Sequence, residues 1–325
     1  MILYIAFPVI GSVCSIVMIT HFIWLVQGSL ENGGPYSDAL IYMDMARDFS
    51  FFEDDPLSYR IAMPALVGAF SHLFGIYEFD SVALVFGTFN FAFFLFGAGV
   101  MLRMGIYEQG INVLELILPA VIIVFMPFFL SAAFYPLPDT GVFLFFSLIL
   151  LALFYRNLFF LYVIVAIAVW VSEITLLAVL VVPALNYIRQ DNWWQAVLPF
   201  IVSGLIYFAV LMNFSPDLSR HFLFSPDGWI STIGSNFQQF DRYFFIQLLP
   251  AFGLTIPFVA YRIYRSGSQR SVQVTLMLYL GYYILFLLAS PEQTPRLMFM
   301  IQPLLILFIF NDKTLEALKV KFIPD

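Results

Sequence analysis

GGPYSDALIYMDMARDFSFFEDDPLSYRIAMP, from Gly33 to Pro64, is the stretch around which the chain is organised. It follows a long apolar run, Leu3–Val26, and it concentrates charged residues in a chain that has few of them. Ionisable residues beside membrane segments usually have a function. We therefore expect this stretch to form an active site on the outer face of a membrane, held in place by the rest of the chain.

The composition predicts a helical membrane protein. Of the 325 residues, 62% are hydrophobic and 11% are charged, and the mean hydropathy is +0.93. Apolar runs of roughly the 20 residues that cross a bilayer recur along the chain. The predicted fold class is all-α: a polytopic transmembrane helical bundle of about ten spans, forming a single domain over residues 1–325. A net charge of −7 argues against nucleic acid as a partner.

The placement of basic residues orients the predicted bundle, because Lys and Arg favour the cytoplasmic side. One threading puts nine of the fourteen Lys and Arg residues inside. Both termini are then cytoplasmic, residues 28–80 form a first outer loop, and residues 213–244 form a second long outer loop. The predicted spans are Leu3–Val26, Val82–Leu102, Val113–Phe134, Gly141–Tyr155, Leu158–Val171, Ile174–Ile188, Val197–Met212, Phe245–Tyr261, Val274–Ser290 and Leu297–Phe310.

One segment leaves the threading open. Ile61–Tyr77 is apolar but short, and it contains Pro64 and His72. It can cross the membrane, which would move Arg103 and Arg156 outside, or it can lie in the interface or re-enter on the same side. We adopt the threading in which it does not cross, so the first outer loop contains interfacial helices.

The first of these interfacial helices is expected over about Asp38–Phe52, with the hydroxyl of Ser37 as its cap. The spacing puts Asp44, Arg47 and Asp48 on one side of it. The remaining positions are mostly apolar, so we expect this helix to lie in the interface plane with its apolar side toward lipid.

A break is expected in the middle of Leu158–Ile188, which is too short for two full spans. Glu173 lies at that point. Two short helices that meet below the outer surface would put the carboxylate in a recessed cavity, since irregular backbone at depth requires cover by protein or water.

The chosen threading brings six separated ionisable residues to one face. A carboxylate can take the proton from an attacking hydroxyl, and arginines can hold a phosphate by paired hydrogen bonds. Such a group is typical of a transferase of phosphate-linked groups. The six residues are Asp38, Asp44, Arg60, Asp139, Glu173 and Arg296.

Five of these residues also have a purely structural interpretation. Asp38 fits the first turn of a helix, where the helix dipole favours an acid. Asp139 can cap the helix that follows the two prolines of YPLPDT. Arg60 can anchor its segment at the headgroups, and Asp44 can simply be solvated. Arg296 can pair with nearby Glu292.

Several segments together resemble the GT-C superfamily of membrane glycosyltransferases, which take sugars from polyprenyl-phosphate carriers. SDALIYMDMARDF resembles the family's Asp-x-x-x-Tyr-x-x-x-Ala loop, and YRIAMPALVGAFSHLFG resembles its basic-x-x-x-Pro helix. YPLPDTGVFLFFSLILLALFYR, WVSEITLLAVLVVPAL and PRLMFMIQPLLIL are similar to its later Asp-, Glu- and Arg-containing segments.

The resemblance implies an outer-face cavity with a defined set of site residues. Asp38 would be the base that activates the acceptor, and Asp139 and Glu173 would line the cavity as further catalytic residues. The substrate would be bound by Tyr42, Asp44, Arg60 and Arg296, with the two arginines on the carrier phosphate. Branches of the family that bind a divalent metal use a paired acid, whereas Asp38 stands alone here, so the metal stays open and no other cofactor is implied.

The predicted function is therefore a glycosyltransferase in a bacterial-type inner (plasma) membrane. Its partners would be membrane lipid, a polyprenyl-phosphate sugar as donor, and a glycan or lipid acceptor, with a membrane protein partner left open. The alternatives are a transporter or flippase with Glu173 as its buried charge, and a non-catalytic subunit of a membrane assembly.

Overall fold

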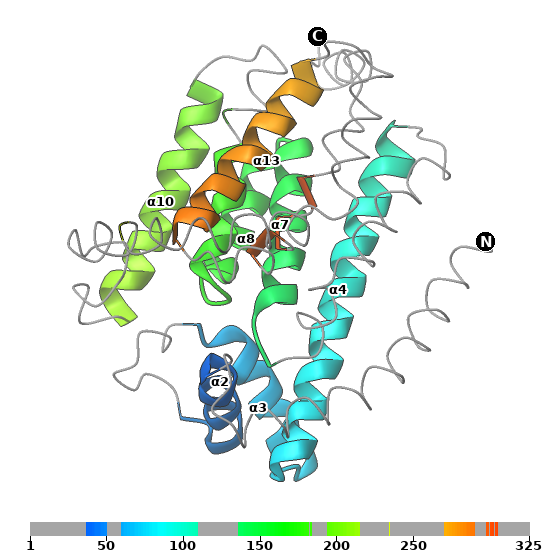
Figure 1. Ribbon diagram of the computed structural model, residues 1–325, viewed down its shortest axis with the longest axis vertical. Coiled ribbons are helices and arrows are strands. Elements are labelled where there is room, and N and C mark those ends of the chain that lie inside the picture. Colours follow the sequence, from blue (N-terminus) through cyan, green and yellow to red (C-terminus); the bar gives the residue numbers. More distant parts are fainter. Residues whose placement is uncertain are drawn as a thin grey trace.

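The described part of the chain is entirely helical. The computed structural model describes residues 37–50, 60–109, 136–181, 183, 194–214, 234, 270–289, 297–298, 300–301 and 303–304. Within these ranges there are seven α-helices, one 3-10 helix and no strand (Figure 1). They are α2 (Ser37–Asp48), α3 (Ala62–Phe74), α4 (Phe79–Gln109), α7 (Asp139–Phe154), α8 (Leu158–Ala168), η1 (Glu173–Leu180), α10 (Trp194–Phe214) and α13 (Arg270–Ala289). The all-α prediction is confirmed for this part.

Helix α4 is the one described helix that is long and apolar enough to cross a membrane. Its apolar window covers Phe79–Met101, and 39% of that window is buried inside the protein. The window agrees with the predicted span Val82–Leu102. Its 31 residues extend about 46 Å at the usual helical rise, so α4 runs along most of the molecule (Figure 1).

The other predicted spans are tested in part. Shorter apolar helices occur at Asp139–Phe154, Leu158–Ala168, Val197–Val210 and Met277–Phe286, each within or overlapping a predicted span. The predicted spans Leu3–Val26, Val113–Phe134 and Phe245–Tyr261 lie outside the described residues, as does nearly all of the second outer loop.

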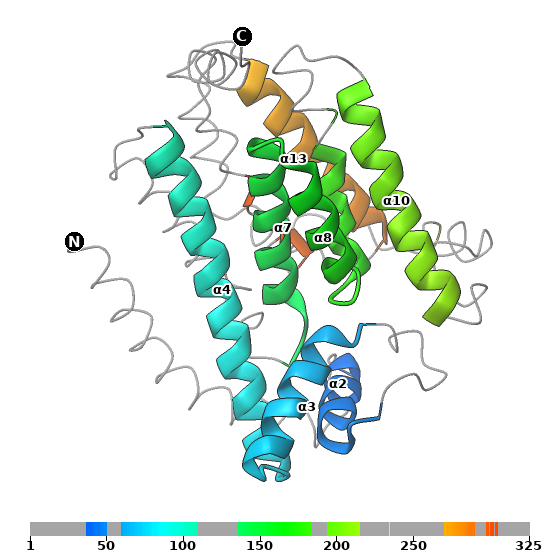
Figure 2. The same ribbon diagram turned by 180° about the vertical axis from the view of Figure 1, so that it is seen from behind.

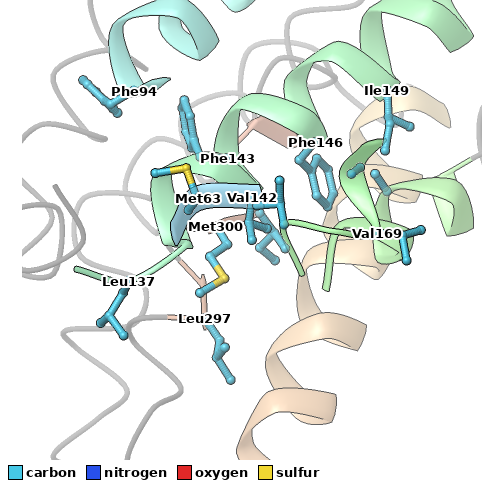
Figure 3. Close-up of a cluster of buried hydrophobic side chains, with 14 of the residues drawn as sticks. Met63, Phe94, Leu137, Val142, Phe143, Phe146, Ile149, Val169, Leu297 and Met300 are labelled. Carbon is cyan, nitrogen blue, oxygen red and sulfur yellow. The ribbon is translucent and has the colours of Figure 1, made fainter. Parts of the chain in front are cut away.

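Helix α7 forms the centre of the fold. It is apolar on all sides, and such a helix must be surrounded by protein or lipid. Nearly every residue from Asp139 to Phe154 is buried, with α4, α8 and η1 packed around it. Figure 3 shows Phe143, Phe146 and Ile149 of this helix within the buried cluster, together with side chains from other segments.

A close approach of backbones joins α4 to α7. A Cβ atom at Gly97 would lie 2.7 Å from Cδ1 of Phe143 and 3.1 Å from Cα of Leu144. Small residues allow helices to approach in this way, and dispersion contacts then stabilise the pair even where water is absent.

Tight turns reverse the chain after α7. Arg156 has a φ of 54°, in the left-handed region, and Asn157 then begins α8 by accepting a hydrogen bond from the backbone N–H of Phe160 at 2.9 Å. Short connections of this kind place successive helices side by side and antiparallel.

Helices α2 and α3 pack together at the end of the molecule where α4 begins (Figures 1 and 2). The predicted helix over Asp38–Phe52 is observed as Ser37–Asp48, so it starts at Ser37 and ends earlier than predicted. The backbone of Phe49, with a φ of 53°, terminates it. The prediction that its apolar side faces lipid is wrong, because Ala39, Tyr42 and Met43 are buried within the protein.

Candidate functional site

A hydrogen bond joins α2 to the segment just before α3. Arg60 lies just before α3, and its Nη1 donates to the hydroxyl of Tyr42 on α2 at 3.3 Å. The Tyr42 side chain is 1% exposed, whereas Arg60 is half-buried. Tyr42 therefore helps to hold the guanidinium at the edge of the protein, and the two predicted substrate-binding residues lie together.

The start of α3 is bound to the turn between α8 and η1. The backbone N–H of Ala62 donates to the carbonyl of Trp170 at 2.9 Å. This bond connects the first loop to a segment more than a hundred positions later in the chain, three residues before Glu173. It brings the backbone near Arg60 close to the backbone that leads into η1.

Gly141 marks where the start of α7 meets these same two segments. A Cβ atom at this position would lie 2.8 Å from Cγ1 of Val171 and 3.6 Å from Sδ of Met63. Figure 3 shows Met63 in the same buried cluster as Val142 of α7. The first turn of α7, the start of α3 and the turn before η1 therefore share one neighbourhood.

Asp139 is the first residue of α7 and is completely buried. The prediction that it caps the helix is wrong, because Pro138 occupies the N-cap and no side chain forms a capping hydrogen bond. An acid in the first turn is still favoured by the helix dipole. Full burial of an acid at the start of a central helix is uncommon, which keeps Asp139 as a candidate for a functional acid.

A buried polar pair fixes the helix turn that carries Asp139. The hydroxyl of Thr140 donates to Oδ1 of Asn90 on α4 at 3.0 Å, and both side chains are fully buried. Sequence reasoning missed Asn90, although a lone amide in the apolar run FGTFNFAFF is a signal of an interior polar contact.

The predicted break at Glu173 is observed in the backbone. Helix α8 ends at Ala168 and η1 begins at Glu173. The hydroxyl of Thr175 donates to the carbonyls of Ser172 at 2.7 Å and Ala168 at 3.2 Å, and Oγ of Ser172 accepts from the N–H of Ile174. Local hydroxyl groups thus satisfy the freed backbone groups, as a break inside a helical bundle requires.

The charged side of α2 faces away from the core. Arg47 forms ion pairs with Asp44 at 3.2 Å and with Asp48 at 2.9 Å, which agrees with the predicted common side. The hydrogen bond between Arg47 and Asp48 lowers the pKa of the Asp48 carboxyl and raises the pKa of Arg47, and the negative charges of Asp48 and Asp44 raise the Arg47 pKa further. Asp44 is exposed on this ion-paired surface, which is the solvated arrangement considered as its alternative.

The structure brings together part of the predicted site. Tyr42 and Arg60 are in contact, and Asp139 and the backbone start of η1 lie at the same end of the bundle. Asp38 lies in the first turn of α2, and the side chains of Asp38 and Glu173 are outside the described part, as is Arg296. Leu297 and Leu137 are both buried members of the hydrophobic cluster (Figure 3).

Metal-ligand side chains do not form a cluster in the described ranges. No group of three His, Cys, Asp or Glu side chains comes together there as potential ligands.

Comparisons with family models, with curated proteins and with solved structures found no match to this chain. The resemblance to membrane glycosyltransferases therefore rests on the sequence segments quoted above.

Proposed function

We propose that the chain is an integral, multi-pass membrane glycosyltransferase of the GT-C type. It would move a sugar from a polyprenyl-phosphate donor to a lipid-linked or cell-envelope glycan acceptor on the outer face. The bundle of about ten spans with cytoplasmic termini belongs to this proposal. The observation that carries it is the meeting of the first loop, the start of α7 and the α8–η1 turn at one end of the molecule.

Exposed apolar side chains support the membrane setting. Phe96 of α4, Phe159 of α8, Leu205 of α10 and Met277 of α13 are each more than 60% exposed. Soluble monomers rarely expose extensive apolar surface, whereas the hydrocarbon of a bilayer covers such side chains at no cost.

The proposed chemistry is a direct displacement at the anomeric carbon. The Asp38 carboxylate would accept the proton of the acceptor hydroxyl as the oxygen of that hydroxyl forms a bond to the carbon. The bond from the carbon to the phosphate oxygen would break, and polyprenyl phosphate would leave. Attack from the opposite side inverts the configuration of the sugar.

Charge stabilisation would come from the arginines. The half-buried guanidinium of Arg60 can donate several hydrogen bonds, and its contact with Tyr42 uses Nη1. Arg60 and Arg296 would hold the phosphate as negative charge develops on it, and such stabilisation is often the largest part of catalysis. Asp139 and Glu173 would line the same site and orient the acceptor.

The test is transfer from labelled donor in membranes that contain the chain. A panel of polyprenyl-phosphate sugars is supplied, and label on the acceptor lipids and released polyprenyl phosphate are both measured. Asp38→Ala should abolish both signals, and Asp139→Asn should lower them strongly, while Asp48→Asn on the exposed side of α2 should leave them unchanged. Unfolding in detergent controls for misfolding. Full turnover in Asp38→Ala would reject the base assignment, and consumption of none of the donors would reject the activity.

The break at α8–η1 favours one second candidate, a transporter or flippase. Discontinuous helices often line the binding sites of transporters. In sealed vesicles this function predicts movement of intact lipid-linked sugar across the bilayer with no bond cleavage. The transferase predicts cleavage in open and sealed membranes alike.

A further inference from the structure

Element η1 is a 3-10 helix although its sequence favours an α-helix. Five of its eight residues, EITLLAVL, are Glu, Leu or Ala, which are strong α-helix formers. Runs of 3-10 helix longer than three or four residues are uncommon, because their hydrogen bonds have poorer geometry. Val181, the next residue, is already α-helical. Contacts with the rest of the protein therefore hold η1 in this form.

The burial of side chains along η1 repeats every three residues. One row of side chains is fully buried, and the next row around the helix is partly exposed. The buried row is Ser172, Thr175, Ala178 and Val181, and the partly exposed row is Ile174, Leu177 and Leu180. Residues three apart eclipse one another in a 3-10 helix, whereas in an α-helix each such step turns the row by about 60°. The packing of α7, α8 and α10 around η1 therefore fits the 3-10 form.

A side chain from α13 binds the middle of η1. The hydroxyl of Tyr282 donates a hydrogen bond to the backbone carbonyl of Leu177, and the tyrosine side chain is buried. The two residues are 105 positions apart, so this bond is a tertiary contact. The hydroxyls of Ser172 and Thr175 bond at the start of η1, and Tyr282 adds a contact further along it. A buried hydroxyl that lost its acceptor would cost free energy, so the bond favours the backbone form that keeps it.

Conversion of η1 to an α-helix would move its first residue, Glu173. Eight residues extend about 16 Å as a 3-10 helix and about 12 Å as an α-helix. Each residue turns by about 120° in the first form and about 100° in the second, so the first residue would rotate by roughly 140° relative to the last. The form of η1 therefore decides where the backbone of Glu173 lies in the candidate site.

We propose that Tyr282 is a positioning residue, which holds η1 in the 3-10 form through its hydroxyl and thereby fixes the backbone at Glu173. The part of this inference that concerns Glu173 rests on the proposed function, in which this acid orients the acceptor. Tyr282 acts through η1 and not on the substrate. A stretch of 3-10 helix within a helical segment often marks a functional hinge, and here the hinge has one defined latch.

The test compares distances along η1 with pairs of nitroxide labels in the full chain. Cys14→Ser first removes the lone native thiol. One pair is Leu177→Cys with Leu180→Cys, three residues apart, and the other is Leu176→Cys with Leu180→Cys, four residues apart. In a 3-10 helix only residues three apart are aligned on one face, whereas in an α-helix residues three and four apart are both neighbours. Each labelled chain is reconstituted into phospholipid vesicles, and dipolar broadening of the electron paramagnetic resonance spectrum reports the separation.

The pair three residues apart should show the stronger broadening when Tyr282 is present. Tyr282→Phe removes only the hydroxyl, and it should raise the broadening of the other pair to the same level. Tyr283→Phe, which removes a hydroxyl one residue further along α13, should keep the original difference. Equal broadening of the two pairs with Tyr282 present would overturn the inference. No change on Tyr282→Phe would also overturn it.

Measurements of sugar transfer separate this inference from the proposed function. Tyr282→Phe should lower kcat several-fold and leave the KM for the donor unchanged, because the arginines and not Glu173 would bind the donor phosphate. Full kcat in Tyr282→Phe, together with changed label distances, would overturn the positioning of Glu173. If the native chain consumes none of the donors, the proposed function fails, and the label distances then decide by themselves whether Tyr282 holds η1.

Discussion

The crossing of α4 and α7 can be tested with two glycines on one helix. Gly97 and Gly99 both lie within α4, so alanine should give each position the same gain from helix propensity, roughly 0.5–1 kcal/mol. Their surroundings differ. A Cβ at Gly99 meets nothing within 4 Å, whereas a Cβ at Gly97 would lie 2.7 Å and 2.9 Å from two ring carbons of Phe143.

The magnitude follows from that contact. Cβ atoms do not approach other heavy atoms below 3.0 Å, and Cα of Leu144 at 3.1 Å prevents an easy displacement of α7. Overpacking of this kind costs about 1–3 kcal/mol. Since the propensity gain is common to both variants, Gly97→Ala should be less stable than Gly99→Ala by about 1–3 kcal/mol.

Unfolding in mixed micelles of mild detergent and sodium dodecyl sulphate, followed by fluorescence, measures the difference. The midpoint should shift to lower dodecyl sulphate for Gly97→Ala and stay level or rise for Gly99→Ala. Equal midpoints, or a more stable Gly97→Ala, would refute the close packing of these two helices.

Three further predictions concern single contacts. Thr140→Val should destabilise the protein by about 0.5–2 kcal/mol, because Asn90 loses a buried hydrogen bond. A double-mutant cycle with Asn90→Leu should show a coupling energy between the two sites. Fully additive effects of the two substitutions on the free energy of unfolding would argue against the bond. Asn157→Ala should lower the free energy of unfolding by about 1 kcal/mol, because α8 loses its N-cap. Asn157→Asp keeps a capping oxygen and should be nearly as stable as the native chain in the same assay. An equal loss of stability in both variants would contradict the capping role. The hydrogen bond from Arg47 lowers the pKa of Asp48 in the folded protein, so this bond should stabilise the fold slightly at pH values above the ordinary carboxyl pKa. The stabilisation should be lost as the pH falls through the lowered pKa of Asp48 in the folded state. The free energy of unfolding is measured against pH, and an equal acid slope for Asp48→Asn and the native chain would contradict this prediction.

The sequence predicts the helical class and several helices well, because apolar runs and turn residues are local signals. The span at Val82–Leu102 and the break at Glu173 both match the described helices. Which of α2 and α3 exposes its apolar side could not be predicted, since the apolar residues of the two helices are similar in type. Only the packing of Tyr42 and Met43 into the core, and the exposure of Leu73 and Phe74, distinguish the two helices.

The sequence proposes the candidate site as a set of residues, but it does not give the contacts that those residues make. Arg60 and Asp139 stand out because charge is rare in this chain. The groups that hydrogen-bond around them do not stand out in the sequence. These groups are the Tyr42 hydroxyl, the carbonyl of Trp170 and the amide of Asn90, and only tertiary packing brings them into place. The cap predicted at Asp139 failed for a local reason, because the helix already takes Pro138 as its N-cap.

The central claim is that the first loop, the start of α7 and the α8–η1 turn meet at one place. Disulfide trapping between two of these segments tests it most directly. A Cβ atom built at Gly141 would lie 3.7 Å from Cγ of Met63 and 2.8 Å from Cγ1 of Val171, the positions that cysteine sulfurs would take. With Cys14→Ser as background, Met63→Cys and Val171→Cys together should form a disulfide on mild oxidation, seen as loss of both maleimide adducts after denaturation and their return on reduction. Met63→Cys with Leu205→Cys, on the exposed side of α10, is the control that should stay reduced. If the first pair keeps both free thiols, or reacts no faster than the control, then the first loop, α7 and the α8–η1 turn do not meet, and the proposed site does not exist.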